Sequence, residues 1–289
     1  MRTKNPFLHC ISLIFLLSVN VQLHSQEARI LKIDSYFFLS PLLAEISGMC
    51  HYDNNIYALN DGGNGAYIFK LDPLNGELKE KYRLRNLRNK DWEELSVYDG
   101  YLYIGDFGNN RGQRTDLAIY RVKIDSLHYS EPPFVITRME YLRQEGKTMS
   151  KKENEWDCEA MTVTGGGIYC FSKNRKDMIT RMYHLKENTH NYLSPVGSFN
   201  AGFLVTGAYY HGDGNYLFLC GYHKKETYLL RFEVKDKPGF TGEYTRYVLP
   251  GLRNTQVESV FVKGDYLYLA SEKASVHQAI YRIRMTDLE

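Results

Sequence analysis

The chain has 289 residues, of which 43% are hydrophobic and 24% charged, a composition typical of a domain with a sizeable buried core. Outside the first 25 residues, 34 basic residues are balanced by 34 acidic ones. This balance argues against a nucleic-acid polymer as partner, because such a partner requires a positive field.

The first residues have the layout of a secretory signal peptide. Arg2 and Lys4 precede an apolar run over 11–19, and a polar stretch then ends in Leu-His-Ser before Gln26. The apolar run is about half the ~20 residues that a membrane-spanning helix needs. We therefore expect cleavage of residues 1–25, no membrane insertion, and export of 26–289 as one domain to the periplasm or the cell exterior.

The remainder is built from an internal repeat in which three short apolar segments recur in step. The first segments read "ISGM" (46–49), "WEEL" (92–95), "CEAM" (158–161), "VTGA" (205–208) and "VESV" (257–260). The second segments read "IYAL" (56–59), "LYIG" (102–105), "IYCF" (168–171), "LFLC" (217–220) and "LYLA" (267–270). The third read "IFKL" (68–71), "IYRV" (119–122), "MYHL" (182–185), "LLRF" (229–232) and "IYRI" (280–283). Turn residues separate them, as expected of strands joined by hairpins.

A fourth strand follows in four of the five units, at 76–84, 133–142, 192–199 and 242–249. The fifth unit ends without one, whereas the exported chain begins with an unassigned strand over 28–38. This arrangement predicts an all-β, five-bladed β-propeller with four-stranded blades, in which the N-terminal strand completes the last blade and closes the ring. A six-bladed ring would require a further unit, and no gap in the sequence is long enough to hold it.

Four cysteines remain after cleavage, and they lack the spacing of a metal site. Each lies in a separate apolar strand pattern, so we expect buried free thiols at Cys50, Cys158, Cys170 and Cys220.

The second positions of the five first strands form a series of oxygen-bearing side chains: Ser47, Glu93, Glu159, Thr206 and Glu258. In a propeller these positions converge on the axis. Three carboxylates so close together need a counter-charge, and oxygen ligands without His or Cys suit a hard cation, Ca²⁺ before Mg²⁺. The alternatives are a neutralising Lys173, Arg175 or Lys273, or a protonated glutamate. Glu94 and the preceding acids Glu45, Asp91 and Asp157 are expected outside the first shell of ligands.

The second strands end on the same face, where they place further polar residues. Asp61 and Asp106 are candidate bases, and Arg111, Lys173 and Arg175 are candidate contacts for a small anionic ligand such as a phosphate ester. Ordinary turns and surface bases explain any single one of these residues better, whereas the residues taken together mark this face as the candidate ligand face.

At these residues the chain resembles the calcium-dependent apyrases of the calcium-activated nucleotidase type. Their ligand series Ser/Glu/Glu/Ser/Glu differs from the one here only by Thr206. "DWEELSVYDGYLYIGDFG" and "DCEAMTVTGGGIYCFSKNR" are similar to that family's blades, although Gly48 stands where the family has an acidic residue. The resemblance implies a central Ca²⁺ and nucleotide hydrolysis. More distantly, the strands resemble phytase-like and lactonase-like calcium propellers.

Two functions follow as hypotheses. The first is a metal-dependent hydrolase of nucleotides or other phosphate anhydrides and esters, with Asp106 or Asp61 as base and Arg111, Lys173 or Arg175 on the phosphate. The second is a non-catalytic propeller in which Ca²⁺ is structural and the loop face binds a protein or glycan.

Overall fold

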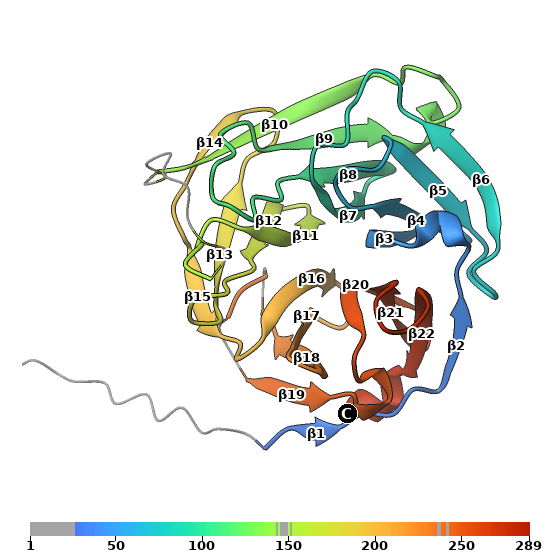
Figure 1. Ribbon diagram of the computed structural model, residues 1–289, viewed down its shortest axis with the longest axis vertical. Coiled ribbons are helices and arrows are strands. Elements are labelled where there is room, and N and C mark those ends of the chain that lie inside the picture. The colour runs from blue at the N-terminus through green and yellow to red at the C-terminus, as the bar shows by residue number, and fades with distance from the viewer. Residues whose placement is uncertain (1–26, 143, 145–149, 151, 236–237, 241–242) are drawn as a thin grey trace, which may run out of the picture.

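The computed structural model describes residues 27–142, 144, 150, 152–235, 238–240 and 243–289. These residues form five β-sheets arranged as blades around a central axis (Figure 1). The five-bladed β-propeller predicted from the repeat is therefore confirmed. The predicted signal peptide, residues 1–25, lies outside the described residues. The same holds for residues 143, 145–149 and 151 of the polar segment 143–156, which the sequence predicts to be an insertion loop.

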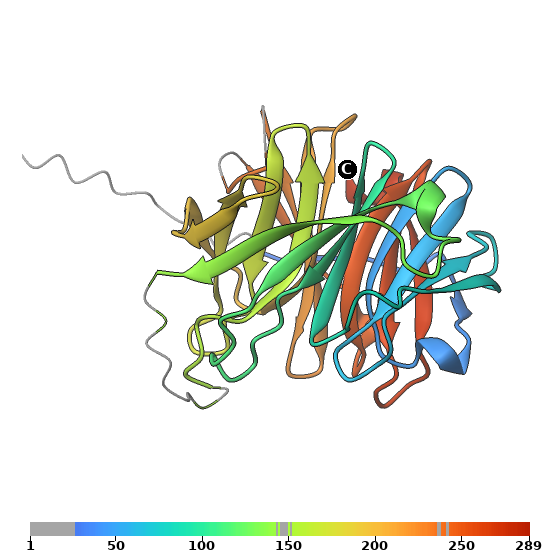
Figure 2. The same ribbon diagram turned by 90° about the horizontal axis from the view of Figure 1, so that it is seen from above.

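Each blade is a four-stranded antiparallel sheet, and its first strand lies innermost. The first strands contact one another in turn around the axis, and the inner strands run between the two faces of the ring (Figure 2). The strands are β3 (Ile46–Tyr52), β4 (Asn55–Asn60), β5 (Tyr67–Leu71) and β6 (Leu78–Arg83) in blade 1; β7 (Trp92–Tyr98), β8 (Tyr101–Asp106), β9 (Ala118–Lys123) and β10 (Phe134–Tyr141) in blade 2; β11 (Cys158–Thr164), β12 (Gly167–Ser172), β13 (Ile179–Leu185) and β15 (Gly197–Asn200) in blade 3; β16 (Leu204–His211), β17 (Tyr216–His223), β18 (Glu226–Glu233) and β19 (Tyr244–Val248) in blade 4; and β20 (Gln256–Lys263), β21 (Tyr266–Glu272), β22 (Ala279–Arg284) and β2 (Ser35–Phe38) in blade 5.

The N-terminal segment closes the ring as predicted. Strand β2 pairs antiparallel with β22, with Phe37 opposite Ile280, and supplies the fourth strand that blade 5 lacks. The predicted strand over 28–38 is nevertheless divided. Its first part, β1 (Arg29–Ile30), pairs in parallel with β19 at the edge of blade 4, because the chain passes the edge of blade 4 before it reaches blade 5.

Blade 3 shows the same division, which corrects the single strand predicted over 192–199. Strand β14 (His190–Leu193) joins the edge of blade 2 in parallel with β10, and only β15 belongs to blade 3. Pro195 lies between the two strands. Proline lacks the N–H group that a strand ladder needs, so a single strand through this position is disfavoured.

The apolar core consists of five clusters, each of which lies between two neighbouring blades. Trp92 is buried between blades 1 and 2, and Phe261 between blades 5 and 1. Burying a side chain of this size stabilises the fold by roughly 1.5–3 kcal/mol. Each blade therefore shares one apolar cluster with the blade on either side. This packing between blades holds the five first strands around the axis.

The four described cysteines are buried and free, as predicted. Within the described residues, we find no helix with the length and apolar character required to span a membrane.

Candidate cation site at the propeller axis

The five residues of the predicted ring share one backbone feature. In every first strand the pairing with the second strand shifts register, as at a β-bulge, and the residue left without a partner is the ring residue. A bulge redirects a side chain relative to its neighbours along the strand. All five side chains are buried, with 1–8% of their surface exposed: Ser47, Glu93, Glu159, Thr206 and Glu258.

The two hydroxyl residues link neighbouring blades in equivalent ways. Ser47 Oγ donates a hydrogen bond of 3.0 Å to the carbonyl of Trp92, and Thr206 Oγ1 donates one of 2.5 Å to the carbonyl of Val257. Each carbonyl belongs to the residue that precedes a ring glutamate in the next blade. Both hydroxyl oxygens keep lone pairs that can coordinate a cation or accept a hydrogen bond.

Two of the ring glutamates interact with a buried lysine. Lys173 follows β12, is 4% exposed, and places its Nζ 2.7 Å from Glu159 Oε2. Burial opposes its charge, but Glu159 and Glu258 outweigh that effect and raise the pKa of Lys173 well above its usual value. Burial raises the pKa of Glu258, and Lys173 is the largest charge that acts against this rise. The neutralising role considered for Lys173 therefore applies to this half of the ring.

Glu93 belongs to a different group. One carboxylate oxygen from each of Asp61, Asp91 and Glu93 lies within 4.8 Å of the others. Burial, followed by the negative charge of Glu159, raises the pKa of Glu93 well above its usual value. Its Oε1 atom is buried and has no hydrogen-bond partner among the described residues. An unpaired buried carboxylate oxygen is costly, so this atom calls for a cation or a proton.

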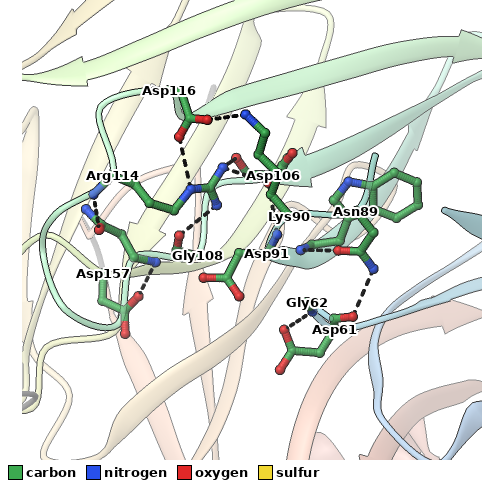
Figure 3. A network of polar contacts seen from close by, with 12 residues as sticks. Asp61, Gly62, Asn89, Lys90, Asp91, Asp106, Gly108, Arg114, Asp116 and Asp157 are labelled. Carbon is green, nitrogen blue, oxygen red and sulfur yellow. Dashed lines mark hydrogen bonds and ion pairs between the residues drawn. The ribbon is translucent and has the colours of Figure 1, made fainter. Parts of the chain in front are cut away.

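Burial and neighbouring negative charges also raise the pKa values of Asp61 and Glu272. Burial raises the pKa of Asp61 to about 6, with Asp91 and Glu45 adding to the rise and the Gly62 amide opposing it. Burial and the charge of Asp61 raise the pKa of Glu272 to about 7. Figure 3 shows Asp61 and Asp91 on adjacent loops, with the Asp61 backbone held by Asn89.

The cluster of Asp61, Asp91 and Glu93, which we call the acidic cluster, fits a hard divalent cation. Calcium binds carboxylate oxygens at about 2.3–2.6 Å, so two oxygens on one ion lie at most about 5 Å apart. The oxygens of the acidic cluster meet that condition. Ligands that are all oxygen favour Ca²⁺ or Mg²⁺ over softer metals.

The other predicted site residues lie in ion pairs or on the surface. Asp106 is 1% exposed and accepts hydrogen bonds from Arg114 Nη2 at 2.8 Å and from the Asp91 amide at 3.1 Å (Figure 3). Arg175 forms a 2.6 Å ion pair with Asp157. Arg111 is exposed.

Asp91, which is expected outside the first shell of ligands, lies in the acidic cluster in the structure. Arg114 is the partner of Asp106, a pairing that the repeat does not predict. A signal for Asp91 was present: an aspartate precedes the ring glutamate by two residues in both "DWE" and "DCE". In the second case Asp157 orients the loop by accepting a 2.9 Å hydrogen bond from the Asn109 amide.

Comparison with known proteins gives a family match to two parts of the chain. The LVIVD repeat model matches residues 91–110 and 255–276. These segments contain β7–β8 of blade 2 and β20–β21 of blade 5, and each includes a ring glutamate. No match is found among curated protein sequences.

Matches among solved structures include hydrazine synthase of Kuenenia stuttgartiensis (9% identity, TM-score 0.40, covering 81% of this chain and 57% of that one). A chain of the mitotic checkpoint complex has 10% identity and a TM-score of 0.42, and the match covers 96% of this chain and 100% of that one. The WD40 repeats of RRP9 have 10% identity and a TM-score of 0.49, and the match covers 89% of this chain and 100% of that one. The chain thus spans little more than half the length of the matched hydrazine synthase chain.

Proposed function

We propose that this chain is an exported, non-enzymatic binding propeller in which one divalent cation, Ca²⁺, joins the blades at the axis. Asp61, Asp91 and Glu93 hold the ion, and Lys173 neutralises the remaining ring glutamates. The observation that carries the proposal is the buried, unpartnered Oε1 of Glu93 within the acidic cluster. Export rests on the signal-peptide pattern of residues 1–25.

The burial of the ring favours a structural ion over a catalytic one. The ring residues are at most 8% exposed, which leaves a substrate little access to them. Arg175, Lys173 and Arg114 each pair with a carboxylate, so their charges are already compensated. An ion that binds only the folded state stabilises it by mass action, without any chemical step.

The test is thermal unfolding in calcium and in chelator. Calcium is expected to raise the midpoint of the wild type, and Glu93→Gln is expected to abolish most of that rise because an amide is a weaker ligand. Glu233→Gln serves as the matched control, since Glu233 is exposed on β18. A calcium effect of equal size in Glu93→Gln and Glu233→Gln would contradict the proposal.

Calcium-dependent hydrolysis of phosphate esters or anhydrides is the second candidate, and it is the one that the apyrase resemblance favours. Its support is Asp61, whose pKa of about 6 lies near that of an effective general base. Release of phosphate from nucleoside diphosphates, dependent on calcium and lost in Asp61→Asn, would replace the first proposal by this one.

A further inference from the structure

The axis has a second end, which differs chemically from the acidic one. The first strands begin at the ring and run to the opposite face, where hairpin turns join them to the second strands. Glu94 directly follows the ring residue Glu93 and is 1% exposed. Its carboxylate accepts hydrogen bonds from the Leu95 amide at 2.9 Å, Ser259 Oγ at 3.2 Å and the Ala208 amide at 3.3 Å, and thereby connects blades 2, 4 and 5.

The Glu94 partners Leu95 and Ala208 line a cavity of about 300 Å³, to which residues from all five blades contribute. Its buried lining includes Met49, Leu95, Ala208 and Val260. Tyr98, which is 42% exposed, and the half-buried Tyr209 add aromatic surface. A concave, mainly apolar site with a few polar groups is the usual form of a small-molecule pocket, and this volume is at the lower end of the usual range.

The cavity lining offers hydrogen-bond donors whose protons are not used within the described chain. Ser96 Oγ accepts from the Val163 amide at 3.2 Å, and Thr162 Oγ1 accepts from the Tyr210 amide at 3.0 Å. Neither hydroxyl proton has an acceptor among the described residues. His51 also lines the cavity, and its Nε2 atom is buried without a hydrogen-bond partner among those residues. In the neutral ring this atom donates or accepts according to the tautomer, so the two hydroxyl groups are the donors on which the argument rests.

The lining also carries no permanent charge. Among its described residues there is no Asp, Glu, Lys or Arg, and burial lowers the pKa of His51, which favours the neutral imidazole. A charged ligand would lose its hydration here without gaining a counter-ion. A neutral ligand with a hydrogen-bond acceptor would satisfy the donors and cover the apolar floor.

We infer that this cavity binds a small, uncharged molecule that is apolar over most of its surface and carries an accepting oxygen. This inference rests on the proposed function as a binding propeller, because it names the class of ligand that such a propeller would bind. The cavity itself contains none of the cation-site residues, and the two sites can therefore be tested separately.

Acetophenone is a suitable probe, because it joins an aromatic ring to one carbonyl acceptor. Ligand-observed NMR titrations would compare it with benzoate, which is charged, and with toluene, which lacks the carbonyl. We expect acetophenone to bind at least tenfold more tightly than benzoate and at least threefold more tightly than toluene. Its affinity should be equal in calcium and in chelator, so failure of the cation proposal leaves this result unaffected.

Two variants locate the binding. Ser96→Ala removes one donor and should weaken acetophenone binding by about threefold to tenfold. Tyr98→Ala removes exposed aromatic surface, is compatible with folding, and should weaken binding at least threefold. Ser198→Ala, at an exposed position on β15, is the control. Acetophenone that does not bind, binds no better than benzoate, or binds equally to the wild type and Tyr98→Ala would overturn the inference.

Discussion

Lys173 and Glu93 lie in the same buried ring but differ in how their charges are compensated. The ammonium group of Lys173 contacts Glu159 at 2.7 Å, whereas the Oε1 atom of Glu93 has no hydrogen-bond partner in the described part of the chain. Breaking a buried ion pair by removing one partner costs about 3–5 kcal/mol, because the other charge remains buried. Lys173 should therefore be essential to the metal-free protein and should compete electrostatically with a bound cation.

Lys173→Met tests this role. In chelator we expect a lower unfolding midpoint than in the wild type, because Glu159 and Glu258 lose their counter-charge. In calcium we expect a larger stabilisation than in the wild type, because the added negative charge attracts the cation. Thermal melts with and without calcium measure both effects.

Lys176→Met is the control for this substitution. Lys176 pairs with Glu155 at the surface, with 46% of its side chain exposed, and exposed pairs contribute only about 0–1 kcal/mol. A calcium effect in Lys173→Met that is smaller than in Lys176→Met would contradict the assigned role.

At the scale of the strand, two of the five bulges have a glycine directly after the ring position, Gly48 and Gly207. A Cβ atom on Gly48 would lie 2.3 Å from the Leu95 amide nitrogen, and one on Gly207 would lie 2.9 Å from the Glu258 carbonyl oxygen. Both obstacles are backbone atoms of the neighbouring blade. Glycine at these positions thus permits the close approach of first strands that brings the ring together.

Gly48→Ala should accordingly destabilise the fold, by about 1–3 kcal/mol or more, because the clash is with backbone that cannot rotate away. Gly212→Ala is the matched control: the nearest heavy atom to its added Cβ lies 3.9 Å away. Urea unfolding of both variants measures the difference. Equal stability of the two would refute the proposed packing constraint.

Strands that a repeat or an alternating pattern determines could be predicted from the sequence. Strand boundaries and side-chain positions that depend on contacts between distant parts of the chain could not. The ring was predictable because Ser47, Glu93 and their equivalents occupy one position of a repeat. The division at Pro195 was missed because the apolar pattern continues across it, and the edge strands β1 and β14 find partners only in a neighbouring blade. The place of Asp91 in the acidic cluster depends on how two loops meet, which the repeat does not specify.

For the whole molecule, the decisive contact is where the two ends of the chain close the ring. Phe37 on β2 packs into the apolar cluster between blades 5 and 1, close to Gly76 of blade 1. Its neighbour Phe38 points to the other side of the strand and is 59% exposed. Because both residues are phenylalanine and differ in burial, the same substitution at each position tests the contribution of ring closure to stability.

Phe37→Ala should reduce the free energy of unfolding by about 2 kcal/mol, since it removes half-buried aromatic surface from the closure. Phe38→Ala should change it much less. Chemical denaturation of both variants provides the measurement. A larger loss from Phe38→Ala would show that the exposed face, and not the closure, stabilises this edge.

The pH dependence also belongs to the whole molecule. Burial raises the pKa of Asp61 to about 6 and of Glu272 to about 7, so the folded state binds protons that the unfolded chain has already released. Calcium-free protein should therefore lose stability as the pH rises from about 4 to about 7. Calcium competes with these protons, so its stabilising effect should be larger at pH 8 than at pH 5. Melts in calcium-free and calcium-containing buffers would refute this linkage if the calcium effect were independent of pH.

The most direct test of the account is a crystal structure of the protein grown with Tb³⁺, a calcium substitute whose anomalous scattering locates it. We predict one strong peak at the axis, bonded to carboxylate oxygens of Asp61, Asp91 and Glu93, with Lys173 still paired to Glu159. A ring without a peak, or a peak that lies only on the outer surface, would contradict the central claim that a cation joins the blades.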